Sequence, residues 1–242
     1  MPLLAIDTAT RQMGVAVIDD GRLLASYELL ADYPHAVELP GAVRRVLQAA
    51  GLPLSRIDGI IIDIGPGSFT GLRIVLAFAK ALAFPGKTPL ICVPSLDVLA
   101  AGVAYAPLAV CPVLDARQKN VYAARYTPRG ASVERQGELF LGPIADWLSS
   151  VKKPALFLGD GCGLYREQIV RHLGDKAQFA PHDLWWPRVG VLARLGADRF
   201  QAGHRDDPAT LIPLYLYPLD CSVRGPNRPT AVIPKAGETV AR

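Results

Sequence analysis

Two aspartates occupy matching places in the two halves of the chain, each at the end of an apolar stretch. Asp7 follows residues 3–6 and Asp115 follows residues 108–114, and a short polar turn comes after each. Carboxylates at strand ends could hold a hydrated cation beside nucleotide phosphates. Because the turns that follow contain no glycine, carboxylates that only stabilise their own turns remain an equally good interpretation.

A second candidate is the segment Gly65–Gly71, which reads Gly-Pro-Gly-Ser-Phe-Thr-Gly and separates an apolar run from a predicted helix. Backbone N–H groups at a helix start can bind an anion. The segment lacks the lysine of a P-loop, the third glycine of a dinucleotide fingerprint and the spacing of a nucleophile elbow. Rather than a catalytic loop, we expect a tight turn that needs positive φ and a helix cap from Ser68 or Thr70. The residues of this loop to which we assign a structural role are Gly65, Gly67, Ser68 and Gly71.

Histidine and cysteine spacing argues against a protein-bound metal. The histidines never fall four residues apart, and the cysteines form no C-x-x-C pair. We therefore expect no metal site and a reducing compartment. These residues are His35, His172, His182 and His204, and Cys92, Cys111, Cys162 and Cys221.

The elements that must position these residues follow from hydrophobic periodicity. Both halves open with a three-stranded β-meander, which suggests a duplicated α/β domain. Strands are predicted over residues 3–7, 13–19, 22–29, 57–64, 90–93, 108–114, 121–126 and 155–159, with another ending near residue 141 after a turn at 127–130. Helices are predicted over residues 35–50, 72–84, 95–101, 165–173 and 189–202, and residues 211–217 are predicted to be extended.

The helix over residues 72–84 is apolar almost all round, so it is either buried or covered by another chain. The helix over residues 35–50 has one apolar face, and we expect Pro40 to kink or divide it.

Composition indicates a globular protein: half of the 242 residues are hydrophobic and 20% are charged. Neither a signal peptide nor a membrane-spanning segment is expected, which favours the cytoplasm. Of the formal net charge of +4, most comes from residues 222–242, where four cations face one anion. We expect that basic segment to be an extended or disordered tail.

Three further motifs accompany the glycine-rich loop. Residues 4–10 read Leu-Ala-Ile-Asp-Thr-Ala-Thr, the loop continues as Leu72-Arg73-Ile74, residues 93–97 read Val-Pro-Ser-Leu-Asp, and Asp115-Ala116-Arg117 follows. In this order and separation they resemble the TsaB (YeaZ) family. The resemblance is strong over about the first 126 residues and thin beyond residue 130.

The resemblance implies an α/β protein of the actin-like, Hsp70-like ATPase (ASKHA) fold, with related domains at residues 1–105 and 106–221, each opening with a β-meander. It implies a non-catalytic subunit, not an enzyme, of the complex that forms N6-threonylcarbamoyladenosine on the tRNA adenosine next to the anticodon. The implied partners are a TsaD-like catalytic subunit and a TsaE-like ATPase. The chain would form a homodimer when alone, contact tRNA only indirectly or weakly, and bind no membrane.

The same resemblance places a first phosphate loop at Asp7–Thr10 and a second at Asp115–Arg117. Ala9 and Ala116 stand where active relatives of the fold use glycine, so both loops are degraded. The degenerate nucleotide site would comprise Asp7, Thr8, Thr10 and Asp115. No tightly bound cofactor is expected, and at most weak binding of ATP or ADP with magnesium at an interface of the complex.

Family members pack the helices corresponding to residues 35–50 and 72–84 into a bundle with the partner. The resemblance therefore implies interface positions at His35, Leu39, Val43, Arg73, Val75, Phe78 and Leu82. The chain departs from the family pattern where Val75, Phe78 and Ala81 replace small residues, and where Tyr217 replaces an arginine. Bulk at such positions changes how closely helices approach.

Two other functions remain open from the sequence. The first is a kinase or ATPase of the same fold that uses Asp7 and Asp115. The second is a protease, for which Ser68 would need a base that the sequence does not identify.

Overall fold

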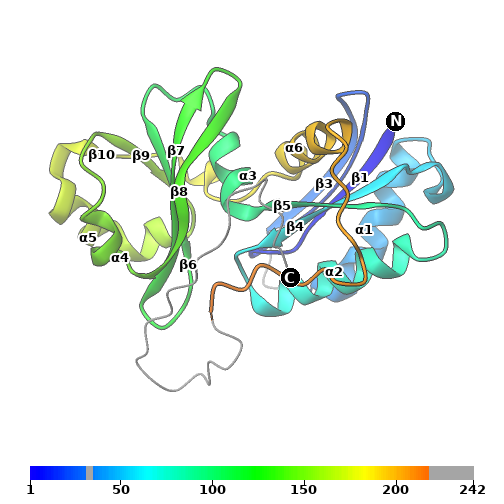
Figure 1. The fold of residues 1–242 in the computed structure, drawn as a ribbon, viewed down its shortest axis with the longest axis horizontal. Coiled ribbons are helices and arrows are strands. Elements are labelled where there is room, and N and C mark those ends of the chain that lie inside the picture. The colour runs from blue at the N-terminus through cyan, green and yellow to red at the C-terminus, as the bar shows by residue number, and fades with distance from the viewer. Residues whose placement is uncertain (31–34, 218–242) are drawn as a thin grey trace. The chain divides into compact units, whose positions relative to one another are not determined.

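The computed structural model describes residues 1–30 and 35–217, and the chain divides into two compact units. The first comprises Met1–Val98 and Trp186–Leu214; the second comprises Leu99–Trp185 and resumes at Tyr215. Each contains one five-stranded sheet (Figure 1). In the described ranges, every helix is too short or too polar to cross a membrane. The predicted tail at residues 222–242 lies outside the described residues.

The sheet of the first unit has the strand order β3-β2-β1-β4-β5. The first three strands are antiparallel neighbours, whereas β1, β4 and β5 run parallel. Asp20 and Gly21, both at positive φ, form the turn between β2 and β3, which suits the twist of a hairpin. The strands are β1 (Pro2–Asp7), β2 (Gln12–Asp19), β3 (Arg22–Leu30), β4 (Gly59–Gly65) and β5 (Leu90–Pro94).

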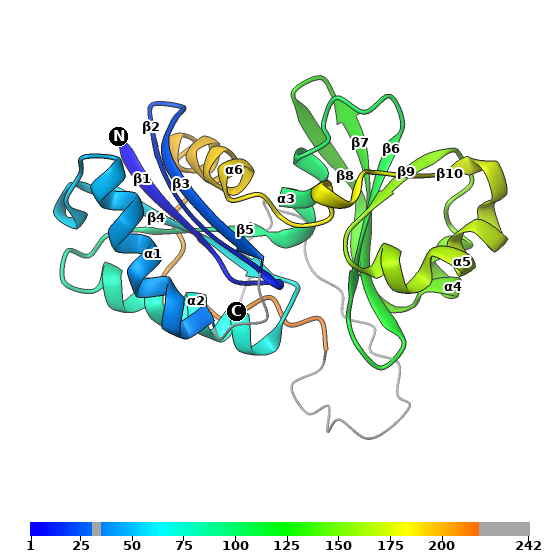
Figure 2. The same ribbon diagram turned by 180° about the vertical axis from the view of Figure 1, so that it is seen from behind.

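Helices cover both faces of this sheet. On one face lie α1 (His35–Ala49) and α2 (Phe69–Ala83), and on the other lies α6 (Val189–Gln201), as Figures 1 and 2 show. The apolar side chains of β1 and β4 therefore alternate between two hydrophobic clusters, one under α1 and α2 and one under α6. Because both faces are buried, β4 is a continuous apolar run interrupted only by Asp63.

The sheet of the second unit has the order β10-β9-β6-β7-β8. One apolar cluster joins this sheet to α4 (Ile144–Leu148) and α5 (Gly161–Leu173). The short helix α3 (Ser95–Ala101) contains the point where the chain leaves the first unit. The strands are β6 (Ala109–Asp115), β7 (Asn120–Arg129), β8 (Ser132–Pro143), β9 (Ala155–Leu158) and β10 (Ala177–Phe179).

The two sheets have the same topology. In each sheet, the first three strands form an antiparallel meander. The first strand of the meander also pairs in parallel with a fourth strand, and a fifth strand lies beyond that one. This confirms the predicted duplication and the actin-like, Hsp70-like α/β fold. It also places Asp7 and Asp115 at the ends of equivalent strands, β1 and β6.

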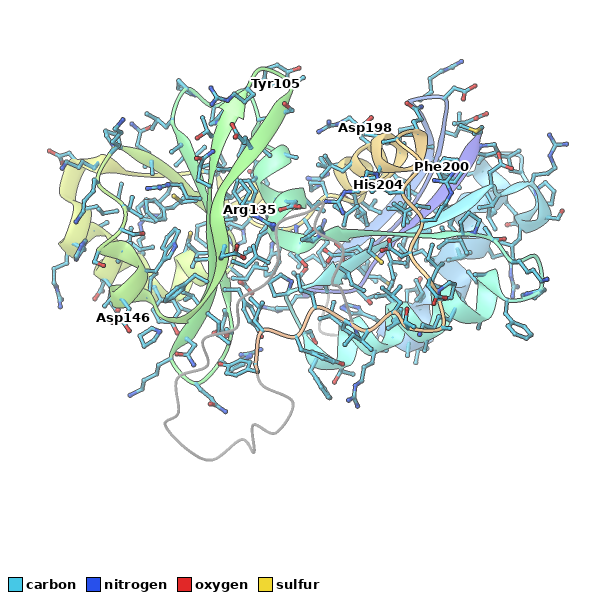
Figure 3. All side chains as sticks on the ribbon, in the orientation of Figure 1. Tyr105, Arg135, Asp146, Asp198, Phe200 and His204 are labelled. Carbon is cyan, nitrogen blue, oxygen red and sulfur yellow. The ribbon has the colours of Figure 1, made fainter. Side chains whose placement is uncertain are left out.

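Some sequence predictions were wrong. Residues 186–214 belong to the first unit rather than the second, because α6 buries its apolar side against β1, β2 and β4. The contact is close: a Cβ at Gly196 would lie 2.3 Å from Ile61 Cγ2. Phe200 of α6 also lies in this cluster, whereas Asp198 is exposed (Figure 3).

Smaller differences concern element ends. Helix α1 runs through Pro40 without being divided. Strand β7 extends to Arg129, so the predicted turn at 127–130 lies later, and α4 and β10 were not predicted. Helix α2 begins at Phe69, before the predicted start, because Ser68 caps it.

Candidate functional site

The first aspartate turn is buried and bonded to itself. Asp7, Thr8 and Thr10 are 1%, 0% and 8% exposed. Asp7 Oδ1 accepts a hydrogen bond from the Ala9 N–H at 2.8 Å, and the Gln12 N–H donates to Thr10 Oγ1 at 3.2 Å. Asp7 Oδ1 and the Ala9 N–H are thus engaged within the turn itself.

The glycine-rich loop packs directly on this turn. Thr8 Oγ1 donates to the Gly71 carbonyl at 2.7 Å, and the Ser68 N–H donates to the Ala9 carbonyl at 2.7 Å. A Cβ on Gly67 would lie 2.2 Å from Ala9 O, and one on Gly71 would lie 2.0 Å from Thr8 O. Glycine is therefore needed at both positions for close backbone approach.

The same loop starts α2 in the predicted manner. Gly65 has a φ of +105°, a conformation that favours glycine. Ser68 Oγ accepts a hydrogen bond from the Gly71 N–H at 3.2 Å, which confirms Ser68 as the helix cap.

Asp63, which the sequence analysis missed, lies on the strand beside Asp7. It is fully buried, and its Oδ1 accepts hydrogen bonds from the Gly65 N–H at 2.8 Å and Ser95 Oγ at 2.6 Å. Burial raises the pKa of Asp63 to about 7 despite these bonds. Burial, and then the neighbouring Asp63, raise the pKa of Asp7 well above its usual range. Asp63 is the one carboxylate within the apolar run of β4, and this sequence feature could have identified it.

The second aspartate turn is closed by another unpredicted carboxylate, Asp160. The Asp115 N–H donates to Asp160 Oδ1 at 2.9 Å, and the Arg117 N–H donates to Asp115 Oδ1 at 2.9 Å. The Arg117 guanidinium also pairs with Asp115 at 3.2 Å. Burial raises the pKa of Asp160. Asp160 comes just after β9, as the glycine-rich loop comes just after the equivalent strand β4 in the first unit. This equivalent position is the sequence feature that could have identified Asp160.

In both turns, some of the backbone N–H groups are already hydrogen-bonded to carboxylates of the chain. Phosphate sites in this class of fold use free backbone N–H groups and glycines for close approach. Here the N–H groups of Ala9, Asp115 and Arg117 donate to carboxylates of the protein itself.

Three predicted interface residues belong to the core instead. Leu39, Val43 and Val75 are at most 5% exposed and pack in the cluster between the first sheet and its two helices. These three side chains face the sheet of their own unit. Because α2 is apolar on nearly every side, its sequence does not show which side packs on the sheet.

The other predicted interface residues lie nearer the surface. Phe78 and Leu82 are half-buried against the edge of the cluster. Arg73 is exposed, with its guanidinium 3.8 Å from the ring centroid of Phe69. The half-buried His35 ring has its Nε2 2.9 Å from the Thr10 carbonyl oxygen, so it ties α1 to the first aspartate turn.

Exposed apolar side chains mark the outer sides of α1 and α2. Val37 is 77% exposed, Phe69 is 54% exposed and Phe84, directly after α2, is 85% exposed. We call this set the α1–α2 surface; it also includes exposed Pro40, Ala77 and Ala81. Exposed apolar side chains of this size are found at protein-binding surfaces.

The last described residues are anchored in the second unit. Tyr217, which replaces the arginine of the family pattern, donates its hydroxyl hydrogen to the Ala116 carbonyl at 3.0 Å and accepts a hydrogen bond from Asn120 Nδ2 at 2.9 Å. It thereby holds the turn after Asp115. Among the described residues, no three histidine, cysteine or acidic side chains gather in a way that could hold a metal ion.

Comparison with known proteins gives consistent matches over most of the chain. The family model for TsaD, tRNA N6-adenosine threonylcarbamoyltransferase, matches residues 29–215. The tRNA threonylcarbamoyladenosine biosynthesis protein TsaB of Bacillus subtilis is 32% identical, over 89% of this chain and 94% of that protein. The protein of the same name from Escherichia coli is 37% identical over 52% of this chain and 55% of its own length. The structure of YeaZ from Pseudomonas aeruginosa matches with a TM-score of 0.77 at 29% identity, over 89% of this chain and 99% of that one.

Proposed function

Because the chain belongs to the TsaB (YeaZ) family of tRNA threonylcarbamoyladenosine biosynthesis, we propose that it is a non-catalytic subunit of the complex that makes this modification. Its task is to bind a TsaD-like catalytic subunit in the cytoplasm, with a TsaE-like ATPase as the third component. The purified chain alone forms a homodimer through the same surface, and it contacts tRNA at most weakly.

The α1–α2 surface carries this proposal. Phe84 and Val37 have more than three quarters of their surface exposed, and Phe69 more than half. Burying such side chains against another chain contributes about 1.5–3 kcal/mol each, which makes them suitable anchors. The core residues Leu39, Val43 and Val75 act behind this surface, because they fix the two helices to the sheet.

The bonding of the two aspartate turns supports a non-catalytic role. Asp7 is buried against Ala9, and Asp115 is held between Asp160 and Arg117. A kinase or ATPase would need both turns to release these bonds before they could receive phosphates. Ser68 Oγ accepts the capping hydrogen bond at the start of α2, which gives this side chain a structural role and supports the non-catalytic reading over a protease.

Reconstitution tests the proposal. The isolated chain should neither hydrolyse ATP appreciably nor modify tRNA. Adding TsaD-like and TsaE-like proteins, threonylcarbamoyl-adenylate and tRNA should produce modified tRNA, and omission of this chain should abolish it. ATP turnover by the pure chain that disappears in Asp7→Ala would show an enzyme instead.

A further inference from the structure

Asp7 and Asp63 are direct neighbours on two parallel strands. The register of β1 and β4 pairs Ala5 with Ile61 and Ile6 with Ile62, so the next residues, Asp7 and Asp63, stand side by side. Side chains at paired positions of parallel strands point to the same face of the sheet. Both aspartates are buried, at 1% and 0% exposure. The fold therefore places two carboxyl groups next to each other, away from water.

Each of the two carboxyl groups has one oxygen in use and one without a partner. Asp7 Oδ1 accepts from the Ala9 N–H, and Asp63 Oδ1 accepts from the Gly65 N–H and from Ser95 Oγ. Within the part of the chain that the structure describes, Oδ2 of both residues is buried and has no hydrogen-bond donor. Buried polar atoms are nearly always hydrogen-bonded, so two such atoms on neighbouring side chains require an explanation.

The charges nearby oppose a doubly ionised pair. Glu28 on β3 acts on Asp7, and Asp97 on α3 acts on Asp63, and both carboxylates raise the pKa of the aspartate concerned. The arginines near these two carboxylates are paired with them. Arg188 lies 2.8 Å from Glu28, and Arg199 lies 3.3 Å from Asp97. On β5, the Cys92 thiol lies near Asp63, and burial raises the pKa of that thiol, so it adds no charge.

We propose that Asp7 and Asp63 hold one proton between their unpartnered oxygens, as a carboxylic acid hydrogen-bonded to a carboxylate. A single shared proton supplies the missing donor for both oxygens at once. It also leaves only one negative charge in the buried pair, as happens when two carboxylates share a site. The raised pKa of both groups agrees with a proton that persists at neutral pH.

A proton fits this pair better than a metal ion does. Magnesium bound through two carboxylates keeps several of its waters, whereas both free oxygens here are buried away from water. The described residues offer no third histidine, cysteine or acidic side chain to complete a metal site.

The shared proton makes Asp7 and Asp63 positioning residues for the start of α2. The bonded oxygen of Asp7 holds the turn at Ala9, and that of Asp63 holds Gly65 and Ser95. The turn and the glycine-rich loop are in turn joined by the Ser68 N–H to Ala9 carbonyl bond. Loss of the proton would set two full charges side by side beneath these contacts. This inference does not depend on the proposed function.

The sign of the pH dependence follows from the raised pKa of both groups. Between the unfolded pKa, about 4, and the folded pKa, the folded chain binds a proton that the unfolded chain has lost. Stability contributed by the pair is therefore complete at acid pH, decreases as the pH rises, and is lost as the pH passes through the folded pKa, which is about 7 for Asp63. The folding equilibrium constant should decrease by up to about tenfold per pH unit for each such proton.

Urea unfolding of the full chain from about pH 5 to about pH 9 tests the proposal. Asp63→Asn keeps the shape and supplies an amide donor to Asp7 without a titrating group. We expect its folding equilibrium constant to depend less on pH than that of the parent, and to exceed the parent value about tenfold or more at the alkaline end. The exposed Asp198→Asn on α6 is the matched control and should follow the parent. Equal pH dependence in Asp63→Asn and the parent would overturn the proposal.

Infrared spectroscopy of the parent at neutral pH gives a readout that does not require a stable variant at every pH. The carbonyl stretch of a protonated carboxyl should be present, should shift in heavy water, and should change in frequency or intensity in the Asp63→Asn spectrum but not in the Asp198→Asn spectrum. Comparing variants removes the contribution of other buried acids such as Asp160. A parent spectrum equal to that of Asp63→Asn, or stabilisation of the parent by magnesium that Asp63→Asn abolishes, would overturn the shared proton.

Discussion

At Gly67 and Gly71 of the glycine-rich loop, the space that a Cβ would occupy is taken by the backbone of the first aspartate turn. The nearest atoms to an added Cβ are the carbonyl oxygens of Ala9 and Thr8, which β1 and its turn hold in place. Neither carbonyl can move aside as a flexible side chain could. These glycines are therefore required by packing, and the contact joins the first aspartate turn to the start of α2.

Gly71→Ala should lower stability by about 3 kcal/mol or more, because its Cβ would lie 2.0 Å from Thr8 O. Gly41→Ala in α1 is the matched control. Its Cβ would meet only the flexible end of Arg45 at 3.4 Å, and alanine favours a helix interior by up to about 1 kcal/mol. Urea unfolding of both variants measures the difference. A Gly71→Ala variant as stable as the parent would show that the two loops can separate freely.

The three described cysteines should resist alkylation in the native state. Cys92, Cys111 and Cys162 are buried free thiols, and burial raises the pKa of Cys111 to about 12. The thiolate is the reactive form, so none of them is activated. Mass spectrometry after iodoacetamide treatment at mildly alkaline pH should find these three unmodified in the folded chain and modified in urea. Rapid native labelling of Cys162 would mean that the start of α5 opens readily.

At the scale of whole elements, α2 has two different apolar sides. Val75, Leu76 and Ala79 fill the core beneath it, whereas Ala77, Ala81 and Phe84 remain exposed. The same composition thus serves two purposes, stability on one side and association on the other. A negative charge should have opposite consequences on the two sides.

Ala81→Glu should leave the fold intact and weaken association by at least about tenfold, because a charge would be desolvated in the complex. Val75→Glu should instead unfold the chain, since the site is 0% exposed. Val170→Glu on α5, at a 45% exposed position, is the control and should change neither property. Circular dichroism and sedimentation, alone and with a TsaD-like protein, separate these outcomes. Normal association of Ala81→Glu would place the partner elsewhere.

At the scale of the whole molecule, the segment after α6 returns along the first unit before it reaches the second. Asp206 pairs with the edge strand β5 through the Leu90 carbonyl and the Cys92 N–H. Further on, Lys80 Nζ donates to the Leu211 carbonyl and the Leu214 N–H donates to the Ile64 carbonyl. This segment therefore covers an exposed sheet edge and secures α2.

Two truncations test the role of this segment. A chain ending at Tyr217 keeps all of these contacts and should melt almost where the full chain does, in line with the tail predicted from composition. A chain ending at Gly203 loses them together with Leu216, which is 1% exposed, and should melt about 5 °C or more lower. Differential scanning calorimetry compares them. A large loss for the chain ending at Tyr217 would show that residues 218–242 contribute to the folded structure.

The sequence by itself determined what depends on neighbours along the chain. Alternation of apolar residues predicted the meanders, and a hydroxyl residue before an apolar run, Ser68 or Thr70, predicted the helix cap, because strand pleating and capping are local properties. The repeated order of elements then predicted the duplicated fold. The family resemblance added the expected partners, which no local pattern contains.

Only the tertiary structure decided which surfaces meet. Periodicity shows that α2 and α6 are apolar but not which sheet covers them, so Val75 was misplaced at an interface and α6 in the wrong unit. Asp63 and Asp160 likewise acquire their roles from Asp7 and Asp115, which lie far away along the chain. A carboxylate becomes buried and loses its water only when segments that are distant along the chain pack around it, so the sequence near the carboxylate does not show this burial.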